Sequence, residues 1–241
     1  MKYIILNLIM MAAVTVSIIQ RNQPEKDDFE TSAGKLSIYF FGHASLMFNF
    51  NGTIIYTDPV SKYCDYGKYP KADIILLTHQ HSDHFDTSVI KILSKANTQI
   101  ILTATIFNTL KAGIVMKNGD KKNIEGIEIE AVPAYNITTG REQFHPKGRD
   151  NGYIITLGNK RIYIAGDTEN ISEMASLKNI DIAFLPMNQP YTMLPEQVAD
   201  AVNKFHPKIL YPYHYGDTDV SILKKLLADN KNIDIRIRGL K

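Results

Sequence analysis

The sequence predicts an α+β fold, a four-layer αββα sandwich in which two pseudo-repeated halves each supply one sheet and its outer helices. The evidence is a pair of hairpin signals, each a Gly/Asn dipeptide between two apolar runs. They are Asn51-Gly52 between runs 46–50 and 53–57, and Gly158-Asn159 between runs 153–157 and 161–165. The strands that leave these turns end at Asp58 and Asp167, an offset of 109 positions (167 − 58).

The later elements keep nearly the same offset, as expected of an internal repeat. The apolar run 72–75 corresponds to 180–183, and the run 99–102 corresponds to 208–211. Apolar residues at helical spacing predict one outer helix in each half: Val89, Ile90 and Leu93 in the first, and Val198, Ala201, Val202 and Phe205 in the second. With a further strand over 36–41, each half contains hairpin, strand, strand, helix and strand, so we hypothesise a duplication.

The N-terminal part differs from the rest of the chain. Lys2 precedes an apolar stretch over 3–19, and residues 20–30 are mostly polar. This pattern predicts an export signal, which would make the protein periplasmic or extracellular. Because no small-x-small cleavage site follows, an uncleaved membrane anchor is the alternative. We therefore assign residues 1–30 to the signal or anchor with its polar linker, and residues 31–241 to one folded domain.

Composition limits the partners. The chain has 241 residues, of which 44% are hydrophobic, and a formal charge of +2 with dispersed Lys and Arg, so no nucleic-acid partner is expected. Cys64 is the only cysteine, which excludes an intramolecular disulfide and a Cys-ligated zinc site. The sequence predicts no oligomeric state.

The densest chemical signal is the run Thr-His-Gln-His-Ser-Asp-His at 78–84, directly after the apolar run 74–77. In an extended segment His79, His81 and Asp83 would project to one side, and His84 would join them only if the chain turns. A helical pattern that opens at Phe85 and Asp86 supplies that turn. Imidazole and carboxylate together suit zinc, iron, manganese or nickel, and four ligands at this spacing do not converge easily on one ion. The run therefore predicts two adjacent ions.

The His-x-His-x-Asp-His motif resembles the signature of the metallo-β-lactamase superfamily, and the resemblance extends over about residues 36–241. It implies the αββα fold of that type, with the site at one edge between the halves. It also implies Asp167 as a ligand shared by two metals, with a helix-capping Asp as the alternative, and His214 as the last ligand, on the second metal. His206, at a predicted helix end, is interpreted as structural.

The third histidine of the first metal is the open question. The family usually places it soon after a strand of the second half, but here that position carries Tyr135 and Asn136. His145, in Phe-His-Pro-Lys-Gly, resembles a subgroup of family hydrolases with Tyr-Asn followed by His-Pro-Lys-Gly, and a surface-loop histidine is the alternative. The predicted metal ligands are thus His79, His81, Asp83, His84, His145, Asp167 and His214.

Other residues are candidates for supporting or catalytic roles. The resemblance implies that Asp58 orients ligand imidazoles through their free N–H groups. Asp83 could orient or deprotonate a nucleophilic water, and His43, Tyr135 and Tyr191 are candidates to protonate the leaving group. His43 resembles a Gly-His segment that lines the site in related hydrolases, and a core histidine bonded to backbone is equally compatible.

These features predict a dinuclear hydrolase of a small-molecule lactone, ester, amide or phosphodiester, which uses a metal-activated hydroxide. The expected cofactors are two divalent ions, Zn²⁺ first and Mn²⁺, Fe²⁺ or Ni²⁺ as alternatives. The ascorbate-6-phosphate lactonase-like and phospholipase D-like branches resemble the chain more than true β-lactamases do. The alternatives are a β-lactamase proper, or a redox or non-catalytic protein on the same fold; the diiron redox members usually carry Glu where this chain has His81.

Overall fold

The computed structural model describes residues 24–241. The predicted export signal or anchor over 3–19 lies outside the described residues. Within the described range, no helix combines the length and apolar character needed to cross a membrane.

The first half forms one sheet of seven strands that lie in chain order. Its first four strands pair antiparallel and the remaining three pair parallel. The strands are β1 (Glu25–Thr31), β2 (Gly34–Gly42), β3 (Ser45–Phe50), β4 (Thr53–Thr57), β5 (Ile74–Leu76), β6 (Gln99–Leu102) and β7 (Ile114–Val115).

The second half repeats this topology, with four antiparallel strands followed by three parallel ones, again in chain order. Its strands are β8 (Lys121–Ile124), β9 (Ile127–Ala134), β10 (Asp150–Leu157), β11 (Lys160–Ile164), β12 (Ile182–Pro186), β13 (Ile209–Tyr213) and β14 (Asp234–Ile235). Strands β11 and β12 correspond to β4 and β5, so the repeat inferred from the hairpin signals is present in the fold.

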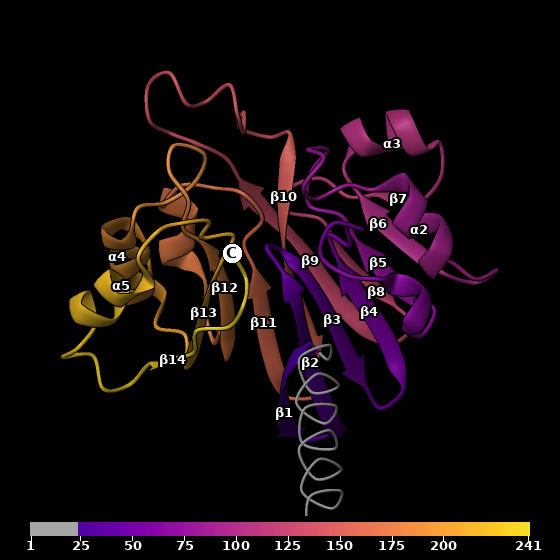
Figure 1. Ribbon diagram of the computed structural model, residues 1–241, viewed down its shortest axis with the longest axis horizontal. Helices are drawn as coiled ribbons and strands as arrows, with labels where there is room; N and C mark the ends of the chain where they lie inside the picture. Colours follow the sequence, from indigo (N-terminus) through magenta and orange to yellow (C-terminus); the bar gives the residue numbers. More distant parts are fainter. Residues whose placement is uncertain (1–23) are drawn as a thin grey trace, which may run out of the picture.

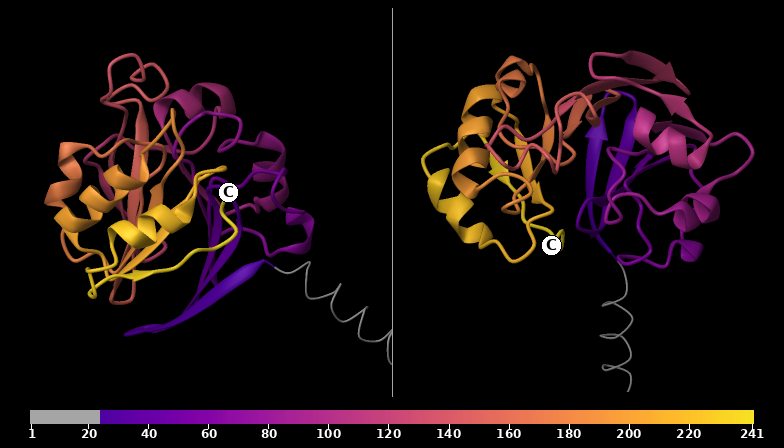
Figure 2. Two further views of the ribbon diagram at one scale, coloured as in Figure 1. Left: turned by 60° about the vertical axis from the view of Figure 1, so that its left-hand side comes forward. Right: turned by 90° about the horizontal axis from the view of Figure 1, so that it is seen from above.

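The helices cover the outer faces of the two sheets, which face each other (Figure 1, Figure 2). The first half carries η1 (Tyr66–Lys68), α2 (Thr87–Leu93) and α3 (Ala104–Leu110), and the second carries η2 (Ser172–Ser176), α4 (Pro195–Phe205) and α5 (Val220–Leu226). The predicted four-layer αββα architecture is therefore confirmed.

A continuous apolar core fills the space between the sheets and contains side chains from both halves. Phe40 and Phe48 of the first sheet contact the second, since the Phe40 ring lies 5.1 Å from that of Tyr211 and the Phe48 ring 6.2 Å from that of Phe184. Burying a side chain of this size stabilises the fold by about 1.5–3 kcal/mol. A second cluster packs the first sheet against α2 and α3. These contacts therefore fix the position of one sheet relative to the other.

The predicted start of the folded domain, residue 31, lies too far along the chain. Strand β1 begins at Glu25 and pairs along its whole length with β2, so residues 25–30 belong to the first sheet. The sequence hid this strand because Phe29 is its only apolar residue and charged side chains occupy most of the exposed positions. The two predicted hairpins, by contrast, pair as expected.

Candidate metal centre

The predicted ligands follow the carboxyl ends of strands in both sheets, except His145, which lies on the loop between β9 and β10. Strand β5 ends at Leu76, and the chain turns at residues 81–84, where the amide of His84 donates to the carbonyl of His81 (3.0 Å) and Phe85 does the same (2.9 Å). The turn thus comes earlier than the helical pattern suggested. Asp86 caps α2 by accepting from the amides of Ser88 and Val89.

This early turn separates Asp83 from the two preceding histidines. The ring nitrogens of His79 and His81 form one group with His145, in which the potential ligand atoms lie within 4.8 Å of one another. Asp83 belongs to a second group, with His84, His214 and His43. The expectation that Asp83 shares a side with His79 and His81 is therefore wrong, because residues 81–84 are not extended.

Asp167, which follows β11, lies between the two groups. Its Oδ2 is 3.5 Å from His145 Nε2 and 3.1 Å from His214 Nε2, and its Oδ1 is 3.3 Å from His84 Nε2. It caps no helix, since η2 begins later and Asp167 is buried. All seven predicted metal ligands thus meet at one place, and a surface-loop position for His145 is excluded because its side chain is buried.

A further layer of hydrogen bonds fixes the rings. Asp58 accepts from His84 Nδ1 (2.8 Å), as predicted, and also from the amide (2.8 Å) and hydroxyl (2.6 Å) of Thr78. Asp150 does the same for His145 Nδ1 (3.0 Å) and is itself bound by the Arg149 guanidinium (2.7 Å). The sequence did not predict this role for Asp150. Its only indication there is that Asp150 is an acidic residue shortly after His145. Such contacts set the tautomer and orientation of a ligand histidine.

The atoms that face the centre lack protein partners. Among residues 24–241, Nε2 of His79, His84 and His214 and Oδ1 of Asp167 are buried and make no hydrogen bond. Buried polar atoms are normally satisfied, and orphaned ones are costly. Nitrogen and carboxylate oxygen atoms left free and aimed at one space are the donor set of a divalent transition-metal ion, so these residues fit the predicted metals.

The electrostatics also favour positive charge here. Burial opposes ionisation of Asp167, but the nearby imidazoles of His214 and His84 hold the pKa of its carboxyl well below the usual range. Burial likewise opposes a charged His214, yet the carboxylates of Asp167 and Asp83 raise the pKa of that imidazole to about 10. For His79, burial dominates and lowers the pKa. The carboxylates therefore remain ionised in a buried site that attracts cations.

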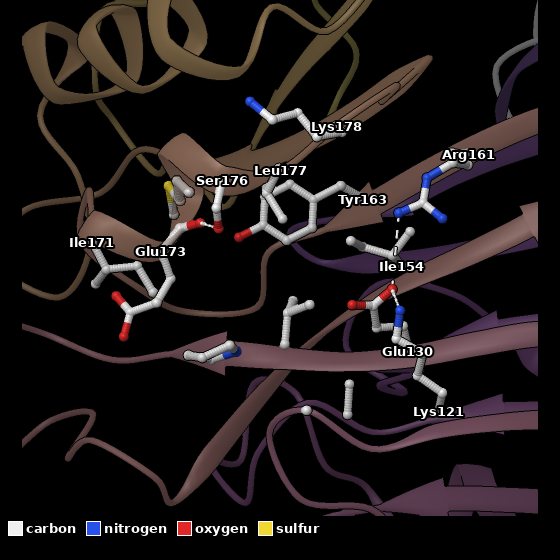
Figure 3. A pocket seen from close by; sticks show the side chains of 15 residues that line it. Lys121, Glu130, Ile154, Arg161, Tyr163, Ile171, Glu173, Ser176, Leu177 and Lys178 are labelled. Carbon is white, nitrogen blue, oxygen red and sulfur yellow. Dashed lines mark hydrogen bonds and ion pairs between the residues drawn. The ribbon is translucent and has the colours of Figure 1, made fainter.

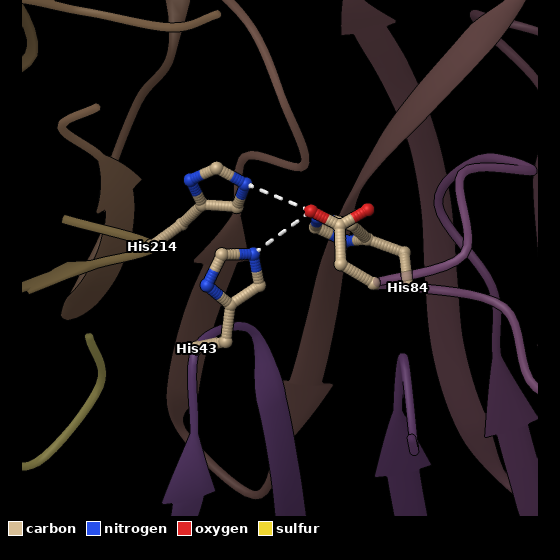
Figure 4. Close-up of side chains that lie close together, drawn as sticks. His43, His84 and His214 are labelled. Carbon is tan, nitrogen blue, oxygen red and sulfur yellow. Dashed lines mark hydrogen bonds and ion pairs between the residues drawn. The ribbon is translucent and has the colours of Figure 1, made fainter. Parts of the chain in front are cut away.

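His43 closes one side of the centre. Its Nε2 lies 3.2 Å from Asp83 Oδ2, its Nδ1 lies 3.1 Å from the main-chain oxygen of Lys241, and its ring centroid is 3.8 Å from that of His214. Figure 4 shows His43 and His214 side by side, each directing a ring nitrogen toward the same carboxylate, and His84 beyond it. His43 thus lines the site and also bonds to backbone, so both interpretations of it hold.

A cavity of about 380 Å³ opens onto the centre. Tyr191, whose side chain is 44% exposed, lies at this cavity as expected. The full lining is His81, Ser82, Asp83, Phe144, His145, Asp167, Asn188, Tyr191 and His214.

Three other residues named from the sequence do not line this cavity. The hydroxyl of Tyr135 donates to Glu173 (2.9 Å), so Tyr135 is withdrawn as a leaving-group acid. His206 is exposed and ends α4 with a left-handed backbone, as fits a structural residue. Burial raises the pKa of the Cys64 thiol to about 11, which disfavours the thiolate.

The Tyr-Asn and His-Pro-Lys-Gly segments are joined by hydrogen bonds that hold the loop between β9 and β10. The amide of Asn136 donates to the carbonyl of His145 (2.8 Å), which closes the loop at its base. The side chain of Asn136 donates to the carbonyl of Tyr191 (2.8 Å), and Lys147 donates to the hydroxyl of Tyr135 (3.1 Å). The two segments therefore hold His145 at the centre, which explains why they occur together.

A second cavity, of about 320 Å³, lies apart from the metal centre between η2 and strands β8–β11 (Figure 3). Glu130 pairs there with Lys121 (3.1 Å) and lies 3.8 Å from Arg161. Apolar residues such as Ile154 and Leu177 form much of its wall. It contains no predicted ligand.

Comparison with known proteins agrees with this site. A family model described as a beta-lactamase superfamily domain matches residues 37–214. A UPF0173 metal-dependent hydrolase from Nanoarchaeum equitans is 32% identical over 190 residues, which cover 75% of this chain and 84% of that protein. A crystal structure of a protein assigned as a metal-dependent hydrolase, from Parabacteroides distasonis, is 53% identical and covers 90% of this chain and 100% of that one, with a TM-score of 0.89. The metallo hydrolase Igni18 from Ignicoccus hospitalis is 24% identical, covers 85% of this chain and 95% of that one, and shares the fold with a TM-score of 0.72.

The fold, the His/Asp groups and these relatives define a metal-dependent hydrolase of the metallo-β-lactamase superfamily. Within that superfamily, the chain belongs to the UPF0173 metal-dependent hydrolase family. The resemblance drawn from the His-x-His-x-Asp-His motif is thereby confirmed.

Proposed function

We propose that the protein is a dinuclear hydrolase of a small-molecule ester, lactone, amide or phosphodiester. The observation that carries this proposal is the position of Asp167 between two groups of potential ligands, with His79, His81 and His145 on one side and Asp83, His84 and His214 on the other. Because nitrogen donors dominate, we propose zinc ahead of manganese, iron or nickel. Two such ions supply a water of lowered pKa and an electrophilic contact for the substrate oxygen.

Asp83 is suited to orient the attacking water. Burial opposes its ionisation, but the nearby imidazoles of His214 and His43 hold the pKa of its carboxyl below the usual range. A carboxylate with so low a pKa is a poor store for a proton, so orientation is the better role. Its side chain is 43% exposed and lines the cavity, where substrate can reach it.

His43 is the favoured proton donor to the leaving group. Its two ring nitrogens both face oxygen acceptors, Asp83 Oδ2 and the main-chain oxygen of Lys241, an arrangement that favours the doubly protonated ring. Burial acts in the opposite direction, and together with His214 and His84 it lowers the pKa of His43 below its ordinary value. The two oxygen acceptors thus position the ring protons, and burial favours the release of one of them. Tyr191 is the second candidate donor, because it lines the same cavity.

The direct test combines metal analysis with hydrolysis assays. We expect the purified protein, loaded with Zn²⁺ and desalted, to retain two equivalents and to hydrolyse at least one of three probes: a nitrophenyl phosphodiester, a homoserine lactone or nitrocefin. Asp167→Asn should lower both the metal content and the rate, since it weakens both groups. Asp65→Asn, which alters an exposed carboxylate that caps η1, is the matched control and should change neither. A fully loaded protein that turns over none of the probes would favour a binding protein instead.

A further inference from the structure

We propose that Phe144 and Tyr191 form an aromatic subsite beside the metal centre, which selects uncharged carbonyl substrates that carry an aromatic group. This inference rests on the proposed hydrolase function and narrows its substrate class. It assigns the ester, lactone or amide classes ahead of the phosphodiester.

The two rings stand together at the wall of the reaction cavity. Phe144 and Tyr191 come from different loops, and both line the same cavity as Asp83 and His145. Their ring centroids lie 5.1 Å apart at an interplanar angle of 71°, an edge-to-face pair. A large aromatic side chain that stays 44% exposed at the mouth of a site offers apolar surface to a ligand.

Hydrogen bonds hold the backbone of both residues in place, and the edge-to-face contact packs their rings together. The amide of Tyr191 donates to the carbonyl of Asn188 (3.0 Å), and the Tyr191 carbonyl accepts from Asn136. The amide of Phe144 donates to the carbonyl of Arg141 (3.0 Å), and the Phe144 carbonyl accepts from Arg149 (2.5 Å). Because this wall is already ordered, a ligand that binds against it would pay little conformational entropy.

The charges of the cavity argue against a phosphate group. Among the described residues, the lining contains no lysine or arginine. The cations of the adjacent loop are engaged elsewhere: Arg149 binds Asp150 (2.7 Å), Arg141 lies 3.7 Å from Glu169, and Lys147 lies 3.3 Å from Glu173. Arginine and lysine are the side chains that proteins favour for binding phosphate, and this loop presents none that is free, so a phosphate here would depend on the metal ions alone.

Asn188 supplies a neutral polar group in the same cavity. Its side-chain amide lines the space and makes no hydrogen bond with another of residues 24–241. It can therefore donate to a substrate carbonyl. An aromatic pair and a carboxamide match an uncharged substrate better than a charged one.

Two esters with the same leaving group test the subsite. We expect the metal-loaded protein to hydrolyse methyl phenylacetate with a higher kcat/KM than methyl acetate, as followed by proton release. Phe144→Ala should reduce this preference by about threefold to tenfold, chiefly through KM for the phenyl ester, as expected for one lost aromatic contact. Phe144→Leu, which keeps apolar bulk, should restore part of the preference. Leu177→Ala in the second cavity is the matched control and should leave the preference unchanged.

Tyr191→Phe separates the aromatic role from proton donation. The subsite requires only the ring, so this variant should keep the preference for the phenyl ester, whereas loss of a proton donor would lower kcat for both esters alike. Metal content and melting temperature, measured on each variant, exclude misfolding as the cause.

Equal kcat/KM for the two esters, or a preference for bis(nitrophenyl) phosphate over both, would overturn the subsite while leaving the hydrolase proposal intact. Failure to retain metal would instead overturn the hydrolase proposal. The two inferences can therefore fail separately.

Discussion

His84 lies between two aspartates that occupy equivalent places in the two halves. Asp58 follows β4 and contacts His84 Nδ1 at 2.8 Å, whereas Asp167 follows β11 and lies 3.3 Å from His84 Nε2. The same strand end thus provides a supporting carboxylate in one half and a candidate ligand in the other. Asp58, His43 and His214 also adopt positive φ angles of 42°, 53° and 47°, which non-glycine residues rarely do. Among residues 24–241, three of the eight non-glycine residues with positive φ thus lie at the site.

Asp58→Asn should weaken metal binding. Both carboxylate oxygens of Asp58 accept hydrogen bonds, from Thr78 and His84, so an amide NH₂ in place of one oxygen would face a donor. We expect the affinity for the more weakly held metal to fall roughly 10- to 100-fold, as measured by competition with a chromogenic chelator. Asp65→Asn should have no such effect. Wild-type affinity in Asp58→Asn would show that the orientation of His84 does not depend on this carboxylate.

At the scale of elements, the loop between β9 and β10 determines whether the first metal group can assemble. It carries His145 and Phe144 and has no regular secondary structure, so its position depends on hydrogen bonds. Glu169, which is fully buried, accepts at Oε2 from the amides of Ile137 and Thr138, both at 2.7 Å. The base of the loop is therefore fixed by a carboxylate from the segment that follows Asp167.

Glu169→Ala should destabilise the fold and loosen the first metal group. Hydrogen bonds to a charged group contribute about 1.5–3 kcal/mol each, so loss of two should cost about 3 kcal/mol or more. The melting temperature should fall by roughly 6–12 °C for a domain of this size. Glu142→Ala, on the exposed part of the same loop, is the control. Differential scanning calorimetry measures the shift, and a Glu169→Ala melting temperature equal to that of Glu142→Ala would show that the loop holds without this carboxylate.

At the scale of the whole molecule, the sequence predicted those features that arise from local pattern. The two hairpins followed from Asn51-Gly52 and Gly158-Asn159, and the central strands and one outer helix of each half followed from the apolar pattern. Four of the seven predicted ligands lie in one histidine-rich motif, whereas His145, Asp167 and His214 were implied by the family resemblance. Equivalent contacts support the repeat further, since Asp73 accepts from the amide of Ile54 (2.8 Å) and Asp181 accepts from the amide of Arg161 (2.9 Å).

The features that were missed depend on tertiary contacts. Strand β1 is stabilised by pairing and by ionic contacts to the distant C-terminal segment, neither of which leaves an apolar pattern in the sequence. Asp150 acquires its role only because the loop returns His145 to it. The grouping of Asp83 with His84 rather than with His79 depends on a turn whose hydrogen bonds involve main-chain atoms alone.

Asp27 in β1 links the first sheet to the second half. Its carboxylate binds the Arg238 guanidinium through both oxygens (2.7 and 2.8 Å) and also accepts from Tyr211 and Arg236. Burial opposes its ionisation, but the hydrogen bonds from Arg238 and Tyr211 outweigh burial and lower the pKa of Asp27. A lowered folded-state pKa stabilises the protein above the unfolded value of about 3.9, and this contribution disappears as the pH falls through the folded pKa.

Asp27→Asn should therefore lower the free energy of unfolding at pH 7 by about 2–3 kcal/mol, the scale of hydrogen bonds to a charged group. The difference from wild type, taken from urea midpoints, should persist at pH 5 and shrink below about pH 4. Asp28→Asn is the matched control, because Asp28 contacts only Ser37, Lys35 and Lys26 of the first sheet and is more exposed than Asp27. Its effect should be smaller, since exposed ion pairs contribute little. If both variants lose equal stability, or if the Asp27→Asn difference is unchanged at pH 3.5, the contact across the two halves does not stabilise the fold.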